Sequence, residues 1–130
     1  MNTAYRVWDG KQMHYWDDEG ISLGIIGTQW VLWRNDRYGF PNIITGSHEE
    51  GSVLMWGTGL KDKNEKMIYE YDIDMIDNEP MIVVYIDGRF GLKYPENHTY
   101  FDDCIAWDEC DIRGDVYQNP ELLEGAECQK

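Results

Sequence analysis

Three closely spaced carboxylates are the residues whose types and spacing could do chemistry. Asp72 and Asp74 lie two residues apart, so on a strand they would share one face, and Asp77 follows in the next turn. Such a group could hold a divalent cation or perform acid–base catalysis. The alternative is a solvated strand face whose charges discourage edge pairing. We favour the solvated face, because neither a histidine nor a phosphate-binding glycine loop accompanies the aspartates.

A second candidate is a zinc site made by His98, Cys104 and Cys110. Five residues separate each ligand from the next, whereas structural zinc sites pair ligands two to four residues apart. Cys104 or Cys128 would act as a nucleophile only if the fold brought a histidine close. We therefore predict no metal, no cofactor and no catalytic residues. The odd number of cysteines is typical of a reducing compartment.

The charge of the chain is strongly asymmetric. After Trp56 there are eighteen acidic residues against seven Lys and Arg, so this half carries −11 of the total −14. Such a field repels phosphate backbones and favours basic partners. We predict that an acidic surface meets a protein partner, and its candidate residues are Asp72, Asp74, Asp77, Asp102, Asp103, Asp108 and Glu109.

Short runs bounded by turn residues predict a mainly β protein. In the first half, Ala4–Trp8 and Met13–Trp16 form one expected hairpin, and Ile21–Ile26 and Gln29–Arg34 form another. A long polar loop follows, with a short strand at Asn42–Thr45. We expect an N-terminal β unit over residues 1–56 and a C-terminal unit over 57–130.

In the second half, a strand is predicted over Met67–Met75. Its expected core face consists of Met67, Tyr69, Tyr71, Ile73 and Met75. Met81–Ile86 is almost continuously apolar and predicts a central strand. The Asp87-Gly88 pair after it is the best short hairpin signal in the sequence, with Arg89–Lys93 as the return strand.

The end of the chain is predicted to hold two further strands and one helical turn. The strands are expected at Cys104–Trp107 and Asp111–Tyr117. Asn119 is the expected N-cap of the helical turn, proline follows it at the first position, and Gly125 closes the turn.

Three segments in series resemble the YopX family of phage and prophage proteins. They run from Tyr5 to Met13, from Thr58 to Ile73 and from Gly114 to Glu124. They are similar to the family's Arg-x-Trp-Asp opening, its Thr-Gly-Leu-x-Asp-x-Asn-Gly-x-x-Ile-Tyr-Glu-Gly-Asp centre and its Gly-Asn-Ile-Tyr-Glu-Asn-Pro-Glu-Leu-Leu close. This sequence has Glu65 and Tyr71 where the pattern has glycine, which puts a type I′ turn at Glu65 and a backbone kink at Tyr71 in doubt.

The resemblance implies a mainly β protein with an SH3-like barrel in its C-terminal part, encoded by a phage or prophage. It implies no activity. Our first hypothesis is a non-enzymatic accessory protein that binds another protein, and a homo-oligomer is a further expectation. The beginning of the sequence does not read as a signal peptide, and no apolar run is long enough to span a membrane, so we expect a cytoplasmic protein.

Three alternatives remain open. The first is an acidic mimic of DNA that blocks a host DNA-binding protein. The second is a nucleic-acid-binding module, which requires the few basic residues of the first half to converge. Those residues are Arg6, Lys11, Arg34 and Arg37. The third is a metal-dependent enzyme using Asp72 and Asp74.

Overall fold

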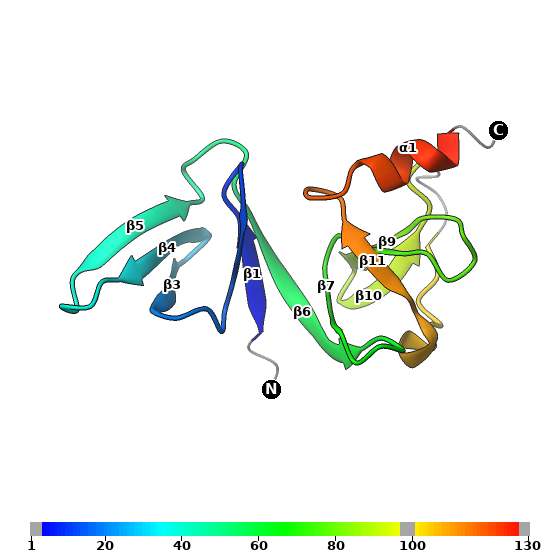
Figure 1. The fold of residues 1–130 in the computed structure, drawn as a ribbon, viewed down its shortest axis with the longest axis horizontal. Helices are drawn as coiled ribbons and strands as arrows, with labels where there is room; N and C mark the ends of the chain where they lie inside the picture. Colours follow the sequence, from blue (N-terminus) through cyan, green and yellow to red (C-terminus); the bar gives the residue numbers. More distant parts are fainter. Residues whose placement is uncertain (1–3, 97–100, 128–130) are drawn as a thin grey trace. The chain divides into compact units, whose positions relative to one another are not determined.

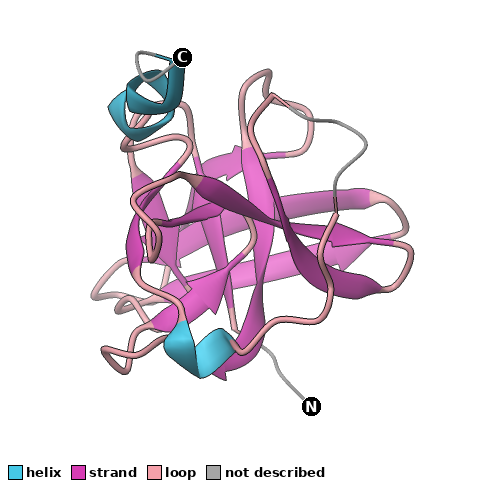
Figure 2. Ribbon diagram, turned by 90° about the vertical axis from the view of Figure 1, so that its right-hand side faces the viewer, coloured by secondary structure: helices cyan, strands magenta, loops and turns pink. Residues whose placement is uncertain are grey.

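The computed structural model describes residues 4–96 and 101–127. It divides into two compact units: an N-terminal unit, Tyr5–Met55, and a C-terminal unit, Met1–Ala4 together with Trp56–Lys130. Strands build nearly all of the regular structure in both units, with two short helical segments beside them (Figure 2). The structure confirms the predicted mainly β fold with a short C-terminal helix. None of the described helices has the length and apolar content needed to cross a membrane.

The N-terminal unit contains a hairpin and a three-stranded sheet (Figure 1). Its strands are β1 (Tyr5–Trp8), β2 (Met13–Tyr15), β3 (Ile21–Ile26), β4 (Gln29–Asn35) and β5 (Pro41–Gly46). Both predicted hairpins are confirmed, since β1 pairs with β2 and β3 pairs with β4 in antiparallel register. The predicted strand within the long polar loop is confirmed as β5, which pairs with β4.

Strand β6 (Val53–Lys61) runs from the N-terminal unit into the C-terminal unit. In the C-terminal unit it pairs with β7 (Met67–Tyr69). A second sheet in this unit has the order β10-β9-β8-β11. Its strands are β8 (Asp72–Asp74), β9 (Met81–Ile86), β10 (Arg89–Lys93) and β11 (Ile112–Asp115). A 3-10 helix, η1 (Trp107–Glu109), precedes β11, and α1 (Glu121–Glu127) follows it.

The hairpin between β9 and β10 forms as its turn residues predict. Asp87 and Gly88 both have positive φ, at 52° and 84°, which is the geometry of a type I′ turn. Arg89 pairs with Ile86 across the turn. This register places Tyr85 directly opposite Phe90. Both side chains line an aromatic groove.

The predicted strand over Met67–Met75 is interrupted, because Tyr71 adopts a left-handed φ of 66°. The break separates β7 from β8 and shifts the alternation of side chains. Ile68, predicted to face away from the core, is therefore fully buried together with Ile73. The backbone keeps the conformation that glycine would favour, although tyrosine occupies the position.

The core of the C-terminal unit joins side chains from both of its sheets. The buried cluster consists of Ile68, Val83, Leu92, Cys110 and Ile112. It draws one residue from each of four strands, β7, β9, β10 and β11, and one from the segment before β11. Burial of such side chains stabilises a unit by about 1.5–3 kcal/mol each.

Three details at the end of the chain differ from prediction. Residues Cys104–Trp107 form no strand, and η1 begins at the last of them. The helix α1 begins at Glu121 and continues through Gly125. The Asn119 side chain instead turns to the preceding segment, where its Oδ1 accepts the Asp115 N–H at 3.2 Å, and the Leu122 N–H donates to the Asn119 carbonyl at 3.1 Å.

Candidate functional site

Asp72 and Asp74 are buried rather than solvated, with relative exposures of 3% and 2%. The prediction of a solvated strand face is therefore wrong for these two residues. The reason is the break at Tyr71 and the position of β8, which is hydrogen-bonded on both sides, to β9 and to β11. Asp77, in the turn that follows, is exposed.

The oxygens of the two buried aspartates accept hydrogen bonds from the backbone. Asp72 Oδ2 accepts the Tyr69 N–H at 2.8 Å. Asp74 Oδ1 accepts the Asp111 N–H at 2.8 Å and the Ile76 N–H at 3.2 Å. These bonds satisfy donors that burial would otherwise leave without partners. The geometry therefore favours a structural role for the pair over metal binding or acid–base catalysis.

A third buried aspartate, Asp62, joins distant parts of the chain. Its Oδ1 accepts the N–H groups of Asn64 and Lys66 at 2.8 and 2.9 Å, and its Oδ2 accepts the Ile112 N–H at 3.0 Å. Burial opposes ionisation, but the hydrogen bonds from Lys66, Ile112 and Asn64 outweigh it, so the pKa of Asp62 lies below its ordinary value. Asp62 organises the turn between β6 and β7 and attaches it to β11.

The surroundings of Asp74 have the opposite effect on its ionisation. Burial raises the pKa of Asp74 despite its two backbone hydrogen bonds, and the charges of Asp111 and Asp77 raise it further. Burial, with the nearby carboxylates of Asp74 and Asp62, also raises the pKa of the Cys110 thiol to about 12. A thiol in this state is a poor nucleophile, so Cys110 acts as a core side chain.

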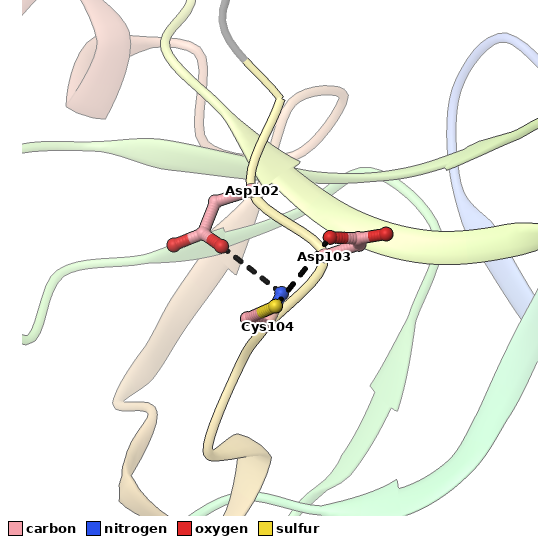
Figure 3. A group of neighbouring side chains, drawn as sticks. All are labelled: Asp102, Asp103 and Cys104. Atoms are coloured by element: carbon pink, nitrogen blue, oxygen red, sulfur yellow. Dashed lines mark hydrogen bonds between the residues drawn. The ribbon is translucent and has the colours of Figure 1, made fainter.

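Asp102, Asp103 and Cys104 form the one group among the described residues with the donor atoms and proximity of a metal site (Figure 3). Asp102 Oδ1 accepts the Cys104 N–H at 3.0 Å, and the Cys104 thiol lies 3.7 Å from Asp103 Oδ1. Asp103 Oδ2 also lies 2.6 Å from Arg89 Nη1. These contacts are typical of an irregular segment held by its own acidic side chains and by an ion pair to β10.

The remaining predicted residues are not brought into one site. Asp108 and Glu109 are exposed on η1. His98 and Cys128 lie outside the described residues. Among the basic residues proposed to converge, Arg6 is 3% exposed and is therefore withdrawn from any surface patch.

An aromatic groove on the C-terminal unit is a concave feature of the described surface. Its cavity volume is about 380 Å³, and it is lined by Trp56, Gly57, Thr58, Glu70, Tyr85 and Phe90. Tyr85 and Phe90 are directly opposite each other on β9 and β10, with ring centroids 4.8 Å apart and an interplanar angle of 63°. Trp56 and Tyr85 remain 39% and 52% exposed, so both rings are accessible to a partner.

Glu70 places a carboxylate beside Trp56 in this groove. Its Oε1 accepts the Trp56 N–H at 2.8 Å, and its own N–H donates to the Trp56 carbonyl at 3.0 Å. The two bonds fix Glu70 against β6 at the point where β7 ends. The aromatic groove therefore combines three ring surfaces with one acidic group.

The sequence did not identify the groove, although part of its signal was present. A two-residue turn at Asp87-Gly88 requires Tyr85 to lie opposite Phe90, so this aromatic pair follows from the predicted hairpin. The approach of Trp56 and Glu70 does not follow from any local pattern, because it depends on how β6 and β7 pair.

Comparison with known proteins places the chain in a family. The family model described as YopX protein matches residues 4–124. The chain is 39% identical to the SPbeta prophage-derived uncharacterized protein YopX of Bacillus subtilis (strain 168), over 96% of this chain and 98% of that protein.

Two solved structures also match this fold. The crystal structure of YopX from Bacillus subtilis has a TM-score of 0.74 and 36% identity, covering 95% of this chain and 99% of that one. A protein from Enterococcus faecalis has a TM-score of 0.58 and 26% identity, covering 92% and 96%. The three sequence segments and the fold agree with these matches, and the chain belongs to the YopX family.

Proposed function

We propose that this phage or prophage protein is a non-enzymatic module that binds another protein through the aromatic groove of its C-terminal unit. The observation that carries the proposal is the exposure of Trp56 and Tyr85 around a cavity of about 380 Å³. Aromatic side chains are enriched at protein interfaces, where they supply large contact areas at low cost in conformational entropy.

Binding agrees better with this groove than catalysis does. Glu70 is the single acidic or basic residue among those that line it, whereas acid–base and nucleophilic mechanisms combine several positioned groups. The carboxylates that a metal-dependent hydrolase would use, Asp72 and Asp74, accept backbone hydrogen bonds in the core.

The charge of the C-terminal half supports a basic partner. Residues 57–130 carry a net charge of −11, which attracts a positively charged surface and accelerates its association. Part of this acidity is internal, since five aspartates of this half are buried, namely Asp62, Asp72, Asp74, Asp111 and Asp115. That burial weakens the case for a DNA mimic, which needs its carboxylates on the surface.

The experiment is affinity capture from the host lysate with matched variants. Trp56→Ala and Tyr85→Ala remove ring surface from the groove, and Tyr38→Ala removes a more exposed ring from the N-terminal unit. We expect a protein that wild type and the Tyr38 variant retain and that both groove variants lose, and its purified form should bind with the same ranking in calorimetry. Retention that is unchanged by Trp56→Ala and Tyr85→Ala would contradict the proposal.

The same purified protein also tests two other kinds of partner, a second copy of the chain and a DNA-binding protein. A second copy of the chain would appear as a concentration-dependent increase in mass by light scattering, and we expect a homo-oligomer of this kind to form independently of the groove. A captured DNA-binding protein that double-stranded DNA displaces, and that the groove variants still retain, would favour the DNA mimic instead.

A further inference from the structure

We infer that strand β3 pairs with β3 of a second copy of this chain, so that the three-stranded sheets of two N-terminal units join edge to edge. The strand lies outside the aromatic groove, so the inference goes beyond the proposed function and does not depend on it. It combines three observations: the direction of the β3 backbone groups, the side chains of β3, and a symmetric register that satisfies both copies.

The direction of the β3 backbone groups follows from the contacts of β4. Trp30 lies opposite Ile25 in the β3–β4 hairpin, but its backbone is directed to the other side. The Trp30 carbonyl accepts the Ser47 N–H at 2.9 Å, and the Trp30 N–H donates to Ser47 Oγ at 3.0 Å. Hydrogen-bonded and non-hydrogen-bonded pairs alternate along antiparallel strands, so the N–H and C=O groups of Ile25 and Leu23 point away from β4.

The beginning of the hairpin agrees with this alternation. The Asn35 N–H donates to the Gly20 carbonyl at 3.0 Å, as expected for a hydrogen-bonded pair in the opposite phase. The Ile21 N–H, which also points outward, donates to the Asp18 carbonyl at 3.3 Å. Within the described part of the chain, β4 is the one strand that pairs with β3. The edge is therefore closed by a turn at its start and open over the two outward residues further along.

Strand β3 lacks the features that protect the edges of sheets. It has no charged residue and no proline, and its pairing with β4 has no bulge. The opposite edge of the same sheet, β5, begins with Pro41 and has a bulge in its pairing with β4 (Figure 1). The edges of the other two sheets either carry charged residues, as β10 and β11 do, or have only three residues, as β2 and β7 do. An uncharged, regular edge is a template for a further strand.

The sequence of β3 is complementary to itself in antiparallel pairing. A two-fold axis at Gly24 places Leu23 opposite Ile25 of the second copy, and Ile25 opposite Leu23 of that copy. Both members of each pair direct their N–H and C=O groups outward, so each pair can exchange two hydrogen bonds. Gly24 then lies opposite its own counterpart in a non-hydrogen-bonded pair, where strands approach most closely and a side chain is absent.

The side chains and the charge also favour a second copy as the occupant. The register sets apolar side chains opposite each other and covers Ile25, which is 53% exposed. Residues 1–56 carry a net charge of only −3, so this half of the chain meets less self-repulsion than the acidic half would. One isologous contact closes both open edges at the same time.

The first test compares two matched variants of the full chain by analytical ultracentrifugation over a range of concentrations. Wild type should shift from one chain toward two as its concentration rises. Ile25→Lys should weaken association at least about tenfold, because it places an ammonium group against Leu23 of the second copy. Ile43→Lys makes the same change at a residue of β5 that is 71% exposed, and it should retain the wild-type dissociation constant within about twofold.

The second test locates the contact by amide hydrogen exchange in ¹⁵N–¹H NMR spectra of the wild type. The Leu23 and Ile25 amides point outward, so their exchange should slow at least about tenfold between dilute and concentrated samples. The Gly24 and Ile26 amides point toward β4 and should be protected at both concentrations. This alternation distinguishes pairing at the β3 edge from association through a face of the sheet, which would not select every second amide.

A chain that stays monomeric up to about 1 mM would overturn the inference. Equal weakening by Ile25→Lys and Ile43→Lys would also overturn it, and so would a dimer without concentration-dependent protection at Leu23 and Ile25. A different protein that binds a monomeric chain and is lost with Ile25→Lys would assign the edge to a foreign strand instead of a second copy. The groove is tested separately, because Trp56→Ala should leave the dimer intact.

Discussion

Replacing Asp62 by asparagine tests how much of the C-terminal unit depends on one buried carboxylate. In the native protein its two oxygens accept three backbone N–H groups, from Asn64, Lys66 and Ile112. Asparagine offers a single side-chain oxygen. Whichever way its amide is oriented, at least one of the three N–H groups then faces an NH₂ group.

The expected cost follows from that unsatisfied donor. Leaving a buried donor without a partner costs about 1–3 kcal/mol, and the remaining bonds lose their charge assistance. We therefore expect Asp62→Asn to lower the free energy of unfolding by about 2–3 kcal/mol at pH 7. Asp74→Asn is the matched control, because Asp74 uses only Oδ1 for both of its backbone bonds and an amide oxygen can replace it.

The two variants should also differ in the direction of their pH dependence. The pKa of Asp62 is lowered in the folded state, so its stabilisation is present above the unfolded pKa, about 4, and is lost as pH falls through the folded pKa. The pKa of Asp74 is raised by burial, so its ionisation destabilises the folded state at pH 7, and this penalty disappears as pH falls toward 4. Asp74→Asn should therefore equal or exceed wild-type stability at pH 7.

The assay is urea unfolding monitored by circular dichroism at pH 7, 5, 4 and 3. The slope of the free energy of unfolding against urea concentration is compared among the three proteins. The difference between wild type and Asp62→Asn should shrink as the pH is lowered below about 4. A cost under about 0.5 kcal/mol at pH 7, or a difference that stays constant down to pH 3, would refute the reasoning.

Three further predictions concern strain, packing and reactivity. Glu65 has a left-handed φ of 63°, so Glu65→Gly should raise the free energy of unfolding by up to about 1 kcal/mol before the entropy of glycine is counted. A lowered urea midpoint would contradict this. A Cβ added at Gly114 would collide with the Asn119 side chain. Gly114→Ala should therefore cost about 1–3 kcal/mol in the same assay, and a neutral result would show that the turn can move. Iodoacetamide at pH 8 should label Cys104, which is exposed, and spare Cys110, whose buried thiol has a pKa of about 12. Peptide mapping reads both cysteines, and equal labelling would contradict the buried assignment.

The sequence predicted the hairpins correctly, because the geometry of a hairpin is determined by a few neighbouring residues. Both N-terminal hairpins and the Asp87-Gly88 turn form as expected, since alternation and turn residues determine them. The doubt about a type I′ turn at Glu65 was justified, because Glu65 has positive φ and Asn64 does not. The kink at Tyr71 was retained despite the loss of glycine, and its ring packs edge to face on Tyr117 at 5.9 Å.

The candidate site could not be predicted in the same way. Alternation alone assigned Asp72 and Asp74 to solvent, but their burial depends on the break before β8 and on its pairing with both neighbours. A run of aspartates in sequence therefore looked like a charged surface, whereas several of these side chains serve as acceptors for buried backbone N–H groups. The aromatic groove depends on contacts between strands that are distant in sequence.

Site-specific photo-crosslinking in the phage host tests the central claim, binding through the aromatic groove, most directly. A photoreactive p-benzoylphenylalanine is placed at Tyr85 in one strain and at Tyr38, on the N-terminal unit, in another. The proposed function predicts one discrete protein adduct from position 85 and its absence from position 38, with loss of the adduct when Trp56→Ala is added. The same adduct pattern from both positions, or none from position 85, would contradict it.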